Sequence, residues 1–450
     1  MNPERAVLLV GANDEAVIKA KKLGLDVLLL QHPTKVTEEQ RRLADVMEVV
    51  DYTRWDLVEP LARRLHTSPG FRLALSLTEP GLENASRVND LLGLGGTPHE
   101  VTLRFRDKQV MRSHLAACDP DAVRAAPLRA REDLEAFGAR VGYPFIVKPT
   151  DATASIGVQR VASAEDADRV WDAVRALVGT RTDRVTTLFL LQDFLMEEFL
   201  DGPEFSVESF SFAGRHVVVA ITEKFTDPAH FAELGHAVPA RLDAAAEDAV
   251  RASVCRFLDV IGLKDGLCHT EIRVGANGPR VIESHNRGGG DAILELVEAA
   301  YGIDLTALAL ARPFGLTDEL PDRLRPHAGA SVRALVGDGG TVESIEGVDA
   351  ARELDDVIDV RISTEPGAAV RPVRDNWDRL GLVVVTGADT TAAVERGARL
   401  IEDLIHIRLT LPDGTTTLAR VAETSATAKP GTAATAKAGT AVTAKAEASA

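Results

Sequence analysis

The chain has 450 residues, 45% hydrophobic and 26% charged, which is a globular balance with room for two to four domains. Its 68 acidic side chains outnumber 51 lysines and arginines and give a formal charge of −17. That acidity argues against a nucleic-acid-binding protein, because such proteins present a basic face to phosphates. The three cysteines show no CxxC spacing, which excludes a zinc site and a disulfide framework and suits a reducing cytoplasm.

Hydropathy gives no sign of a membrane protein. No apolar run approaches the roughly 20 residues that cross a bilayer, and the start of the chain lacks the apolar core of a signal peptide. We therefore expect a cytoplasmic protein without membrane contact.

The first hundred residues alternate short apolar runs with amphipathic helices. We predict strands at 6–10, 27–30, 46–50 and 72–77, with helices at 15–23 and 55–65. This order is typical of βαβ units in a parallel, doubly wound sheet. The first turn reads GANDEA instead of GxGxxG, so an oxidoreductase binding a nicotinamide or flavin is disfavoured.

Later segments predict an α+β body, a smaller lobe and a tail. Helices are expected at 131–141, 164–177 and 243–260, and strands at 145–148, 158–161, 188–192, 269–274, 280–283, 332–335 and 382–385. Period-2 alternation after Glu204 predicts an antiparallel pair that turns at Ala213-Gly214. We divide the chain into a doubly wound domain (1–98), a two-lobed α+β domain (99–312), a small α/β lobe (313–420) and a disordered Ala/Thr/Lys tail (421–450).

Two lysines and a loop of small residues suggest a phosphate site. Lys108 opens a predicted helix, and Lys148 ends the apolar strand FIVK, where its burial is unfavourable unless it emerges into a polar cleft. The adjoining loop DATASIGV, with Ser155 and Gly157, offers backbone N–H groups that can close over phosphates. A single lysine would more often be a surface cation, but the combination favours a nucleotide.

The segment MEEFLDGPEFSVE leaves one predicted sheet, turns at Asp-Gly-Pro and enters another. A cleft between two lobes is expected there. Its carboxylates, Glu197, Glu198 and Glu204, can accept hydrogen bonds from an adenine amino group or a ribose hydroxyl, although exposed glutamate pairs are common in any protein.

The most specific signal is the pair of predicted strands HTEIRV and VIESHNRGGGD. Glu271 and Glu283 would lie near each other on a shared hairpin, and two such carboxylates repel unless one is protonated or a cation lies between them. Hard oxygen ligands beside nucleotide phosphates favour Mg²⁺. Arg287 is then placed to bind a phosphoryl group or acyl phosphate, and Gly288–Gly290 would let the backbone approach a ligand closely. An ion-paired hairpin with a glycine turn is the alternative.

These motifs resemble the ATP-grasp superfamily, and within it the carboxylate–amine (L-amino-acid, or dipeptide) ligases. The resemblance also includes LTEPGLENASRVNDLLGLGG, RDKQVMR, GTVESIEG and RLGLVVVTGADT, and so extends over nearly all of the chain before the tail. It implies a pre-ATP-grasp domain, an ATP-grasp domain and a ligase-type C-terminal lobe. The resemblance also implies a role for each motif residue. Lys108 and Lys148 would bind the ATP phosphates, Glu197 the adenine amino group and Glu204 the ribose, while Glu198 and Leu200 would offer backbone contacts to adenine. Glu271 and Glu283 would bind magnesium, and Arg287 would bind the γ-phosphate and then the acyl phosphate.

The chain departs from the family pattern at one position. The usual Glu-x-Asn-x-Arg has asparagine two residues after the glutamate, whereas here His285 stands there and Asn286 follows. His285 either replaces the amide as a magnesium ligand or faces the substrate. The segment 226–239 resembles the loop that lines the substrate pocket in relatives, so Glu233 and His236 are candidate substrate contacts alongside Gly288 and Gly289.

The expected reaction transfers the γ-phosphoryl group of ATP to a carboxylate. An amine then attacks the acyl phosphate, and an amide, ADP and phosphate are formed, with the protein supplying positioning and charge. ATP and Mg²⁺ are the expected cofactors, small-molecule acids and amines the expected partners, and a homodimer is left open. The rival classes are an ATP-grasp carboxylase and a non-catalytic ATP-binding module.

Overall fold

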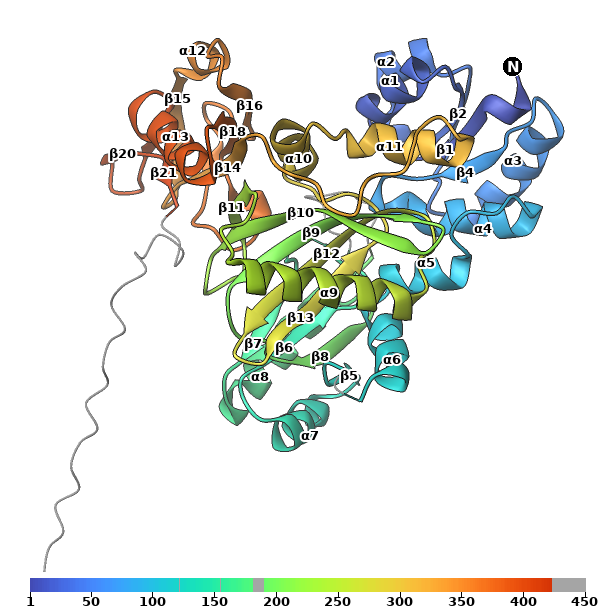
Figure 1. Ribbon diagram of the computed structural model, residues 1–450. Coiled ribbons are helices and arrows are strands. Elements are labelled where there is room, and N and C mark those ends of the chain that lie inside the picture. Colours follow the sequence, from blue (N-terminus) through green and yellow to red (C-terminus); the bar gives the residue numbers. More distant parts are fainter. Residues whose placement is uncertain (121, 154, 181–189, 423–450) are drawn as a thin grey trace, which may run out of the picture.

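The computed structural model describes residues 1–120, 122–153, 155–180 and 190–422 (Figure 1). The predicted tail lies outside these residues except for its first two. Val421 belongs to a short strand, β21 (Arg420–Val421), that pairs with Leu335, and Ala422 is buried. Residues 421 and 422, which the prediction placed in the tail, therefore belong to the folded C-terminal region. Within the described ranges, none of the helices is both long and apolar enough to cross a membrane.

The N-terminal region is a parallel sheet with the order β3-β2-β1-β4, as the sequence predicts. Its elements are β1 (Ala6–Val10), α1 (Asp14–Lys22), β2 (Asp26–Gln31), α2 (Glu38–Leu43), β3 (Val46–Val49), α3 (Trp55–Thr67), β4 (Leu73–Leu75) and α4 (Leu82–Leu92). All five residues of β1 are buried, because apolar clusters cover both faces of the sheet. Two strands of this sheet, β1 and β4, contain no charged residue.

A second sheet, antiparallel and four-stranded, has the order β5-β8-β6-β7 (Figure 1). The chain reaches it through α5 (His99–Arg106) and α6 (Lys108–Cys118). It comprises β5 (Ala125–Leu128), α7 (Arg131–Val141), β6 (Phe145–Pro149), β7 (Gln159–Val161), α8 (Ala167–Leu177) and β8 (Phe194–Glu198). Of the strand predicted at 188–192, residues 188 and 189 lie outside the described residues, Leu190 forms a β-bridge, and Leu191 and Gln192 lie outside any strand, since β8 begins at Phe194. There Phe194 and Met196 pack into the apolar core beneath the sheet.

The central sheet is antiparallel and runs β13-β12-β9-β10-β11-β14-β18-β16. Its first part comprises β9 (Glu204–Phe212), β10 (Arg215–Thr226), β11 (Glu233–Val238), α9 (Ala244–Ile261), β12 (Gly266–Gly275) and β13 (Gly278–His285). The hairpin turn at Ala213-Gly214 has positive φ at both residues, 51° and 91°, as the sequence predicts. Helix α9 covers the apolar face of these strands (Figure 1), which leaves the other face for polar side chains.

The C-terminal region extends that same sheet. After α10 (Ile293–Tyr301) and α11 (Leu305–Ala311) come β14 (Gly329–Val336), β15 (Gly340–Glu346), α12 (Val348–Arg352), β16 (Val357–Ile362), β17 (Ala369–Val370), β18 (Gly381–Gly387), α13 (Thr390–Asp403), β19 (His406–Thr410) and β20 (Thr416–Leu418). Strand β14 pairs with β11, so the predicted boundary at 312/313 does not interrupt the sheet. A further four-stranded sheet, β17-β15-β19-β20, completes the region.

Candidate active site

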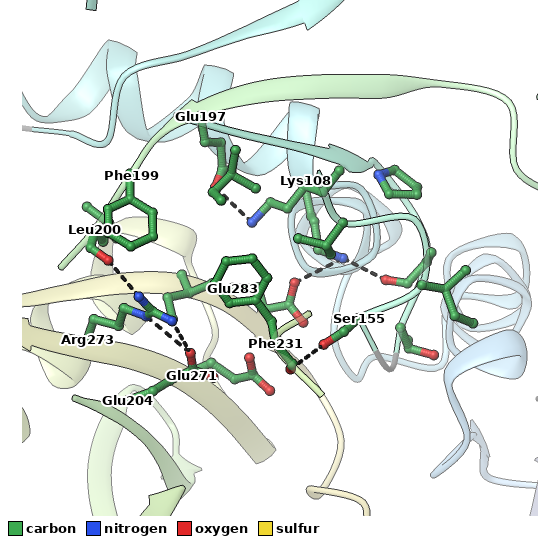
Figure 2. A pocket seen from close by; sticks show the side chains of 18 of the residues that line it. Lys108, Ser155, Glu197, Phe199, Leu200, Glu204, Phe231, Glu271, Arg273 and Glu283 are labelled. Atoms are coloured by element: carbon green, nitrogen blue, oxygen red, sulfur yellow. Dashed lines mark hydrogen bonds and ion pairs between the residues drawn. The ribbon is translucent and has the colours of Figure 1, made fainter. Parts of the chain in front are cut away.

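A pocket lies between the β5–β8 sheet and the polar face of the central sheet (Figure 2). Ten residues predicted from the sequence line it: Lys108, Lys148, Ser155, Glu197, Glu198, Leu200, Glu204, Glu233, Glu271 and Glu283. Six others lie outside the lining: Gly157, His236, His285, Arg287, Gly288 and Gly289. Local patterns in the sequence thus identified acids and lysines on separate elements, and the fold brings them together around one pocket.

Lys148 and Glu197 form a buried ion pair on neighbouring strands. In the β6–β8 pairing Lys148 lies opposite Leu195 and Ile146 opposite Glu197, so the two side chains meet on one face, 2.7 Å apart. Arg112 on α6 binds the same carboxylate at 2.7 Å. Burial and the Arg112 charge lower the pKa of Lys148, and Glu197 only partly offsets them. Both oxygens of Glu197 are therefore occupied, and the adenine contact predicted for its carboxylate would require this cluster to open.

Three further residues have different contacts, although all of them were predicted to bind the adenine or the ribose: Glu198, Leu200 and Glu204. Glu198 points away from Glu197 and pairs with Arg124 at 2.7 Å and Arg280 at 3.1 Å, and its backbone N–H donates to the Arg124 carbonyl at 2.9 Å. The Leu200 carbonyl accepts from Arg273 Nη1 at 2.9 Å, and the same guanidinium binds Glu204 at 3.1 Å (Figure 2). Arg273 therefore links the predicted adenine and ribose positions.

A buried lysine that the sequence analysis did not select, Lys224 on β10, lies at the centre of the acidic wall. Its Nζ is 2.8 Å from Glu204, 2.7 Å from Glu233 and 2.8 Å from Glu271, and its side chain is 2% exposed. Burial alone would lower the pKa of Lys224, but three carboxylates outweigh it and raise the pKa well above the ordinary value. The ammonium group of Lys224 thus forms ion pairs with three carboxylates that come from three different strands.

Glu271 and Glu283 lie opposite each other on β12 and β13, as the hairpin predicts. Lys108 Nζ is 3.1 Å from Glu283 (Figure 2). Burial would raise the pKa of both acids, but Lys224 lowers that of Glu271, and Lys108 with His285 lowers that of Glu283 well below its usual value. Both side chains are therefore carboxylates at neutral pH, and their separate cations let them coexist.

Two hydrogen bonds anchor the loop after β6. Lys108 Nζ donates to the Ala152 carbonyl at 2.8 Å, and Ser155 Oγ donates to the Phe231 carbonyl at 3.0 Å (Figure 2). Ser155 and Gly157 both have positive φ, and a side chain at Gly157 would press on Pro149 and Leu177 instead of facing the pocket. Gly157 shapes the loop from behind, whereas Ser155 joins it to the β10–β11 connection.

Arg287 lies beside the pocket and is bound to the N-terminal region. Its Nε donates to Glu79, a buried acid that also binds Arg106 and lies 3.1 Å from His285 Nδ1. Burial would raise the pKa of Glu79, but His285 and the two arginines hold it well below its usual value. His285 Nε2 is 3.1 Å from Glu283, so both ring nitrogens face carboxylates in this structure.

The candidate substrate residues of β11 meet the C-terminal region. Glu233 accepts from the Asn376 side chain at 2.8 Å, and Asp291 pairs with Arg379 at 2.6 Å. His236 is fully buried, with Nε2 3.7 Å from Asp291, and together with Glu233 these residues form a cluster of metal-ligand type. Lys224 pairs with Glu233 and Arg379 with Asp291, so cations already neutralise both acids and the cluster has little net charge to offer a metal ion.

Gly288 and Gly289 are small for packing reasons. A β-carbon at Gly288 would lie 2.7 Å from the Leu294 side chain, and one at Gly289 would lie 2.8 Å from His269. His269 in turn binds the buried Glu208. Burial alone would lower the pKa of His269, but Glu208 raises it to about 9. Close packing within the protein is thus one reason for glycine at both positions, and the predicted approach of a ligand stays a prediction.

The sequence analysis missed several charged residues that organise the site, namely Glu79, Arg112, Lys224, Glu208, His269 and Arg273. Period-2 alternation provided a signal for three of them. In EFSVE, Glu208 lies on the same face of its strand as Glu204, and in HTEIRV, His269 and Arg273 flank Glu271 at steps of two. For Glu79, Arg112 and Lys224 the partners are distant in sequence, so no local pattern marks them.

Comparison with known proteins agrees with this architecture. Residues 141–295 match a family model described as an ATP-grasp domain, and residues 333–410 match L-amino acid ligase C-terminal domain 2. Alanine–anticapsin ligase of Bacillus subtilis (strain 168) is 28% identical over 252 residues, which is 53% of this chain and 53% of that protein. The match therefore spans about half of each protein.

Solved structures share the fold over most of the chain. An L-amino acid ligase from Bacillus licheniformis has a TM-score of 0.76 at 22% identity and covers 90% of this chain and 99% of that one. The biotin carboxylase domain of a Hydrogenobacter thermophilus 2-oxoglutarate carboxylase, solved with MgADP and bicarbonate, has a TM-score of 0.65 at 15% identity and covers 93% of this chain and 91% of that one. At these identities the likeness concerns the fold.

The family match identifies residues 141–295 as an ATP-grasp domain, and the fold agrees with it. The C-terminal match narrows the class, because it belongs to L-amino acid ligases. The chain thus carries an ATP-grasp domain and an L-amino acid ligase C-terminal domain, as its motifs predicted, and it is similar to alanine–anticapsin ligase.

Proposed function

We propose that the protein is an ATP-dependent ligase that activates a carboxylate as an acyl phosphate and condenses it with an amine to form an amide or peptide bond. ADP and phosphate would be released. The observation that carries the proposal is the register pair Glu271 and Glu283 facing Lys108 and Lys148 across one pocket. That arrangement provides anionic ligands for a cation and cationic groups for phosphates within the same space.

The residues present fit Mg²⁺ and ATP. Two ionised carboxylates opposite each other suit a hard cation that also takes phosphate oxygens. Glu271 and Glu283 would hold the metal, while Lys108 and Lys148 would hold phosphates. When bound, Mg²⁺ would neutralise charge on the phosphates during transfer. Its binding would compete with Lys224 and Lys108 for the same carboxylate oxygens, so these ion pairs must rearrange as the site fills.

His285 is proposed as a support for Glu283 more than as a third metal ligand, because both of its ring nitrogens already face carboxylates. Glu198 and Leu200 would present backbone to the adenine edge, with Glu204 near the ribose. Glu197 would act through Lys148, whose ammonium it holds at 2.7 Å.

Arg287 is the proposed catalytic residue for phosphoryl transfer. A guanidinium at this position can bind the γ-phosphate and then the acyl phosphate in a forked geometry. In this structure Glu79 binds its Nε, and Nη1 donates to the Gly288 carbonyl at 2.7 Å. The side chain is thereby held by two elements before any substrate arrives.

Amino acids are the proposed substrates, on the strength of the relatives' names and the cluster around Glu233 and His236. Arg379 and Asn376 bring the C-terminal region to that cluster, so the region would help to shape the substrate pocket. The free cysteines support a cytoplasmic location. A homodimer would be tested by light scattering.

The function is tested by measuring ADP release over pairs of amino acids, followed by the mass of any condensed product. Amine-dependent ADP release with a product one water lighter than its two substrates is expected, and it should disappear in Arg287→Ala. ADP release that depends on bicarbonate would indicate a carboxylase instead. ATP binding without ADP release for any acceptor would indicate a non-catalytic module.

A further inference from the structure

Two buried side chains beneath the site, Glu208 and His269, have no part in the chemistry proposed above. They lie directly opposite each other on β9 and β12, with Glu208 fully buried and His269 5% exposed. Burying a carboxylate is unfavourable unless its charge and hydrogen-bonding capacity are met. The contacts of this pair therefore indicate what it holds in place.

Each oxygen of Glu208 has a different partner. Oε1 accepts from His269 Nδ1, and Oε2 accepts from the backbone N–H of Gly289 at 3.2 Å. The other ring nitrogen, His269 Nε2, faces Glu271 Oε1 at 3.4 Å. A continuous chain thus runs from the loop after β13, through the pair, to the carboxylate of Glu271.

The glycine at 289 is part of the same arrangement. A β-carbon there would lie 2.8 Å from His269 Nδ1 and 3.0 Å from Glu208 Oε1. Any larger residue would push the loop off the pair. The loop that begins with Arg287 and continues through Gly289 therefore rests directly on these two side chains.

We infer that Glu208 and His269 are positioning residues that fix Glu271 and the Gly289 backbone relative to each other. The acid that would bind magnesium and the loop that carries Arg287 are thereby set as one unit. This inference rests on the proposed function for its catalytic consequence, although its structural part can be tested without turnover.

Three substitutions separate the contacts. His269→Asn keeps an N–H near Nδ1 and removes the group that faces Glu271, whereas His269→Gln reaches toward Glu271 and loses the Nδ1 position. Glu208→Gln replaces one accepting oxygen by an NH₂ group, so it cannot accept from both partners. Ser209→Ala is the matched control, because Ser209 is the fully buried neighbour on the opposite face of β9 and donates to the Cys268 carbonyl at 3.4 Å.

Each variant is characterised, as the full chain, by three measurements. These are hydrogen exchange of the peptide containing Gly289 without ligand, Mn²⁺ binding in the presence of ADP, and the kinetics of ADP release. Glu208→Gln should speed exchange at Gly289 and lower kcat about 10–100-fold, the range for residues that orient metal ligands, with amino-acid KM nearly unchanged. His269→Asn should weaken Mn²⁺ binding about tenfold while exchange at Gly289 stays slow. His269→Gln should retain more of the Mn²⁺ affinity, and Ser209→Ala should match the wild type.

Wild-type exchange and Mn²⁺ binding in folded Glu208→Gln and His269→Asn would overturn the inference. If those variants fail to fold, Gly289→Ala decides, because it leaves the pair intact and displaces only the loop. It should lower kcat with normal melting, and unchanged kcat would refute the coupling. A wild type that binds Mn²⁺ and ADP but releases no ADP with any acceptor would refute the proposed function, while the exchange and Mn²⁺ results would still decide the role of the pair.

Discussion

The two walls of the pocket are built from opposite charge ratios. On the wall of β6, β8 and α6, Lys148 and Arg112 surround the single carboxylate of Glu197. On the wall of the central sheet, one ammonium, that of Lys224, meets three carboxylates: Glu204, Glu233 and Glu271. One wall therefore carries an excess of positive charge and the other an excess of negative charge.

This difference in charge explains how one pocket can bind a metal ion and a polyphosphate together. These buried charges are paired within a wall or, for Lys108 and Glu283, across the pocket, so they are not buried alone, which would be strongly unfavourable. The remaining positive excess suits phosphates, and the remaining negative excess suits a divalent cation. The following substitutions test this division, from the largest expected effect to the smallest.

Lys224→Met removes the ammonium that pairs with three carboxylates of the acidic wall and should have the largest effect on stability. Removing one partner from a buried ion cluster costs about 3–5 kcal/mol of unfolding free energy. Without the ammonium, burial and mutual repulsion would raise the folded-state pKa values of the acids above their unfolded values. The loss of unfolding free energy should therefore be greatest at neutral pH and become smaller as the pH falls toward 5. Denaturant unfolding at several pH values measures it.

Lys224→Arg is the control for Lys224→Met, since it keeps the charge. A Lys224→Met protein with wild-type stability at pH 7 would show that the three acids do not depend on this lysine.

Arg287→Ala should act on chemistry and not on either wall. We expect kcat for amide formation to fall roughly 10²–10³-fold, as when one donor to a developing anion is lost. Arg287→Lys should recover only part of it, because the forked geometry is lost. ATP binding without turnover should change far less. A higher amino-acid KM with normal kcat would instead make Arg287 a clamp for the substrate carboxylate.

Lys148→Met removes a cation from the positive wall. ATP affinity should fall, with a loss on the order of 2–5 kcal/mol if a buried charge pair is broken, measured by titration calorimetry. Folding should suffer less than in Lys224→Met, because Arg112 continues to neutralise Glu197. Unchanged affinity would remove Lys148 from the phosphate site.

Glu283→Gln keeps the shape of the acidic wall and removes one anionic ligand. The magnesium concentration for half-maximal ADP release should rise about tenfold, the lower end for disturbed metal sites. Glu198→Gln, on the adjoining surface, provides the comparison and should leave the magnesium requirement unaltered. Equal magnesium curves for Glu283→Gln and the wild type would contradict the proposed metal site.

Arg124→Ala should have the smallest effect. Its guanidinium is more than half exposed and pairs with Glu198, and such surface pairs contribute about 0–1 kcal/mol. Stability and turnover should both stay close to those of the wild type. A loss as large as that of Lys148→Met would mean that Glu198 belongs to the positive wall.

Much of this site could be predicted from the sequence, because strand periodicity reveals which residues share a face. The step of two from Glu271 to Arg273 places both side chains toward the pocket, and the step from Glu283 to His285 places the histidine beside that glutamate, outside the lining. The same periodicity cannot reveal a partner on another element. Lys224 in AITEKF is locally indistinguishable from a solvent-facing lysine at a strand end, yet it is 2% exposed.

Sequence patterns by themselves determined the fold class, the hairpins and the chemical character of each segment. These follow from local physics: apolar periodicity, turn chemistry and the cost of burying a charge. The tertiary structure decided which charges pair, since Glu79 reaches Arg287 across 208 residues and Arg112 reaches Glu197 across 85. Such pairs depend on how separate sheets close over one pocket, and charge attraction acts through space, whatever the distance along the chain.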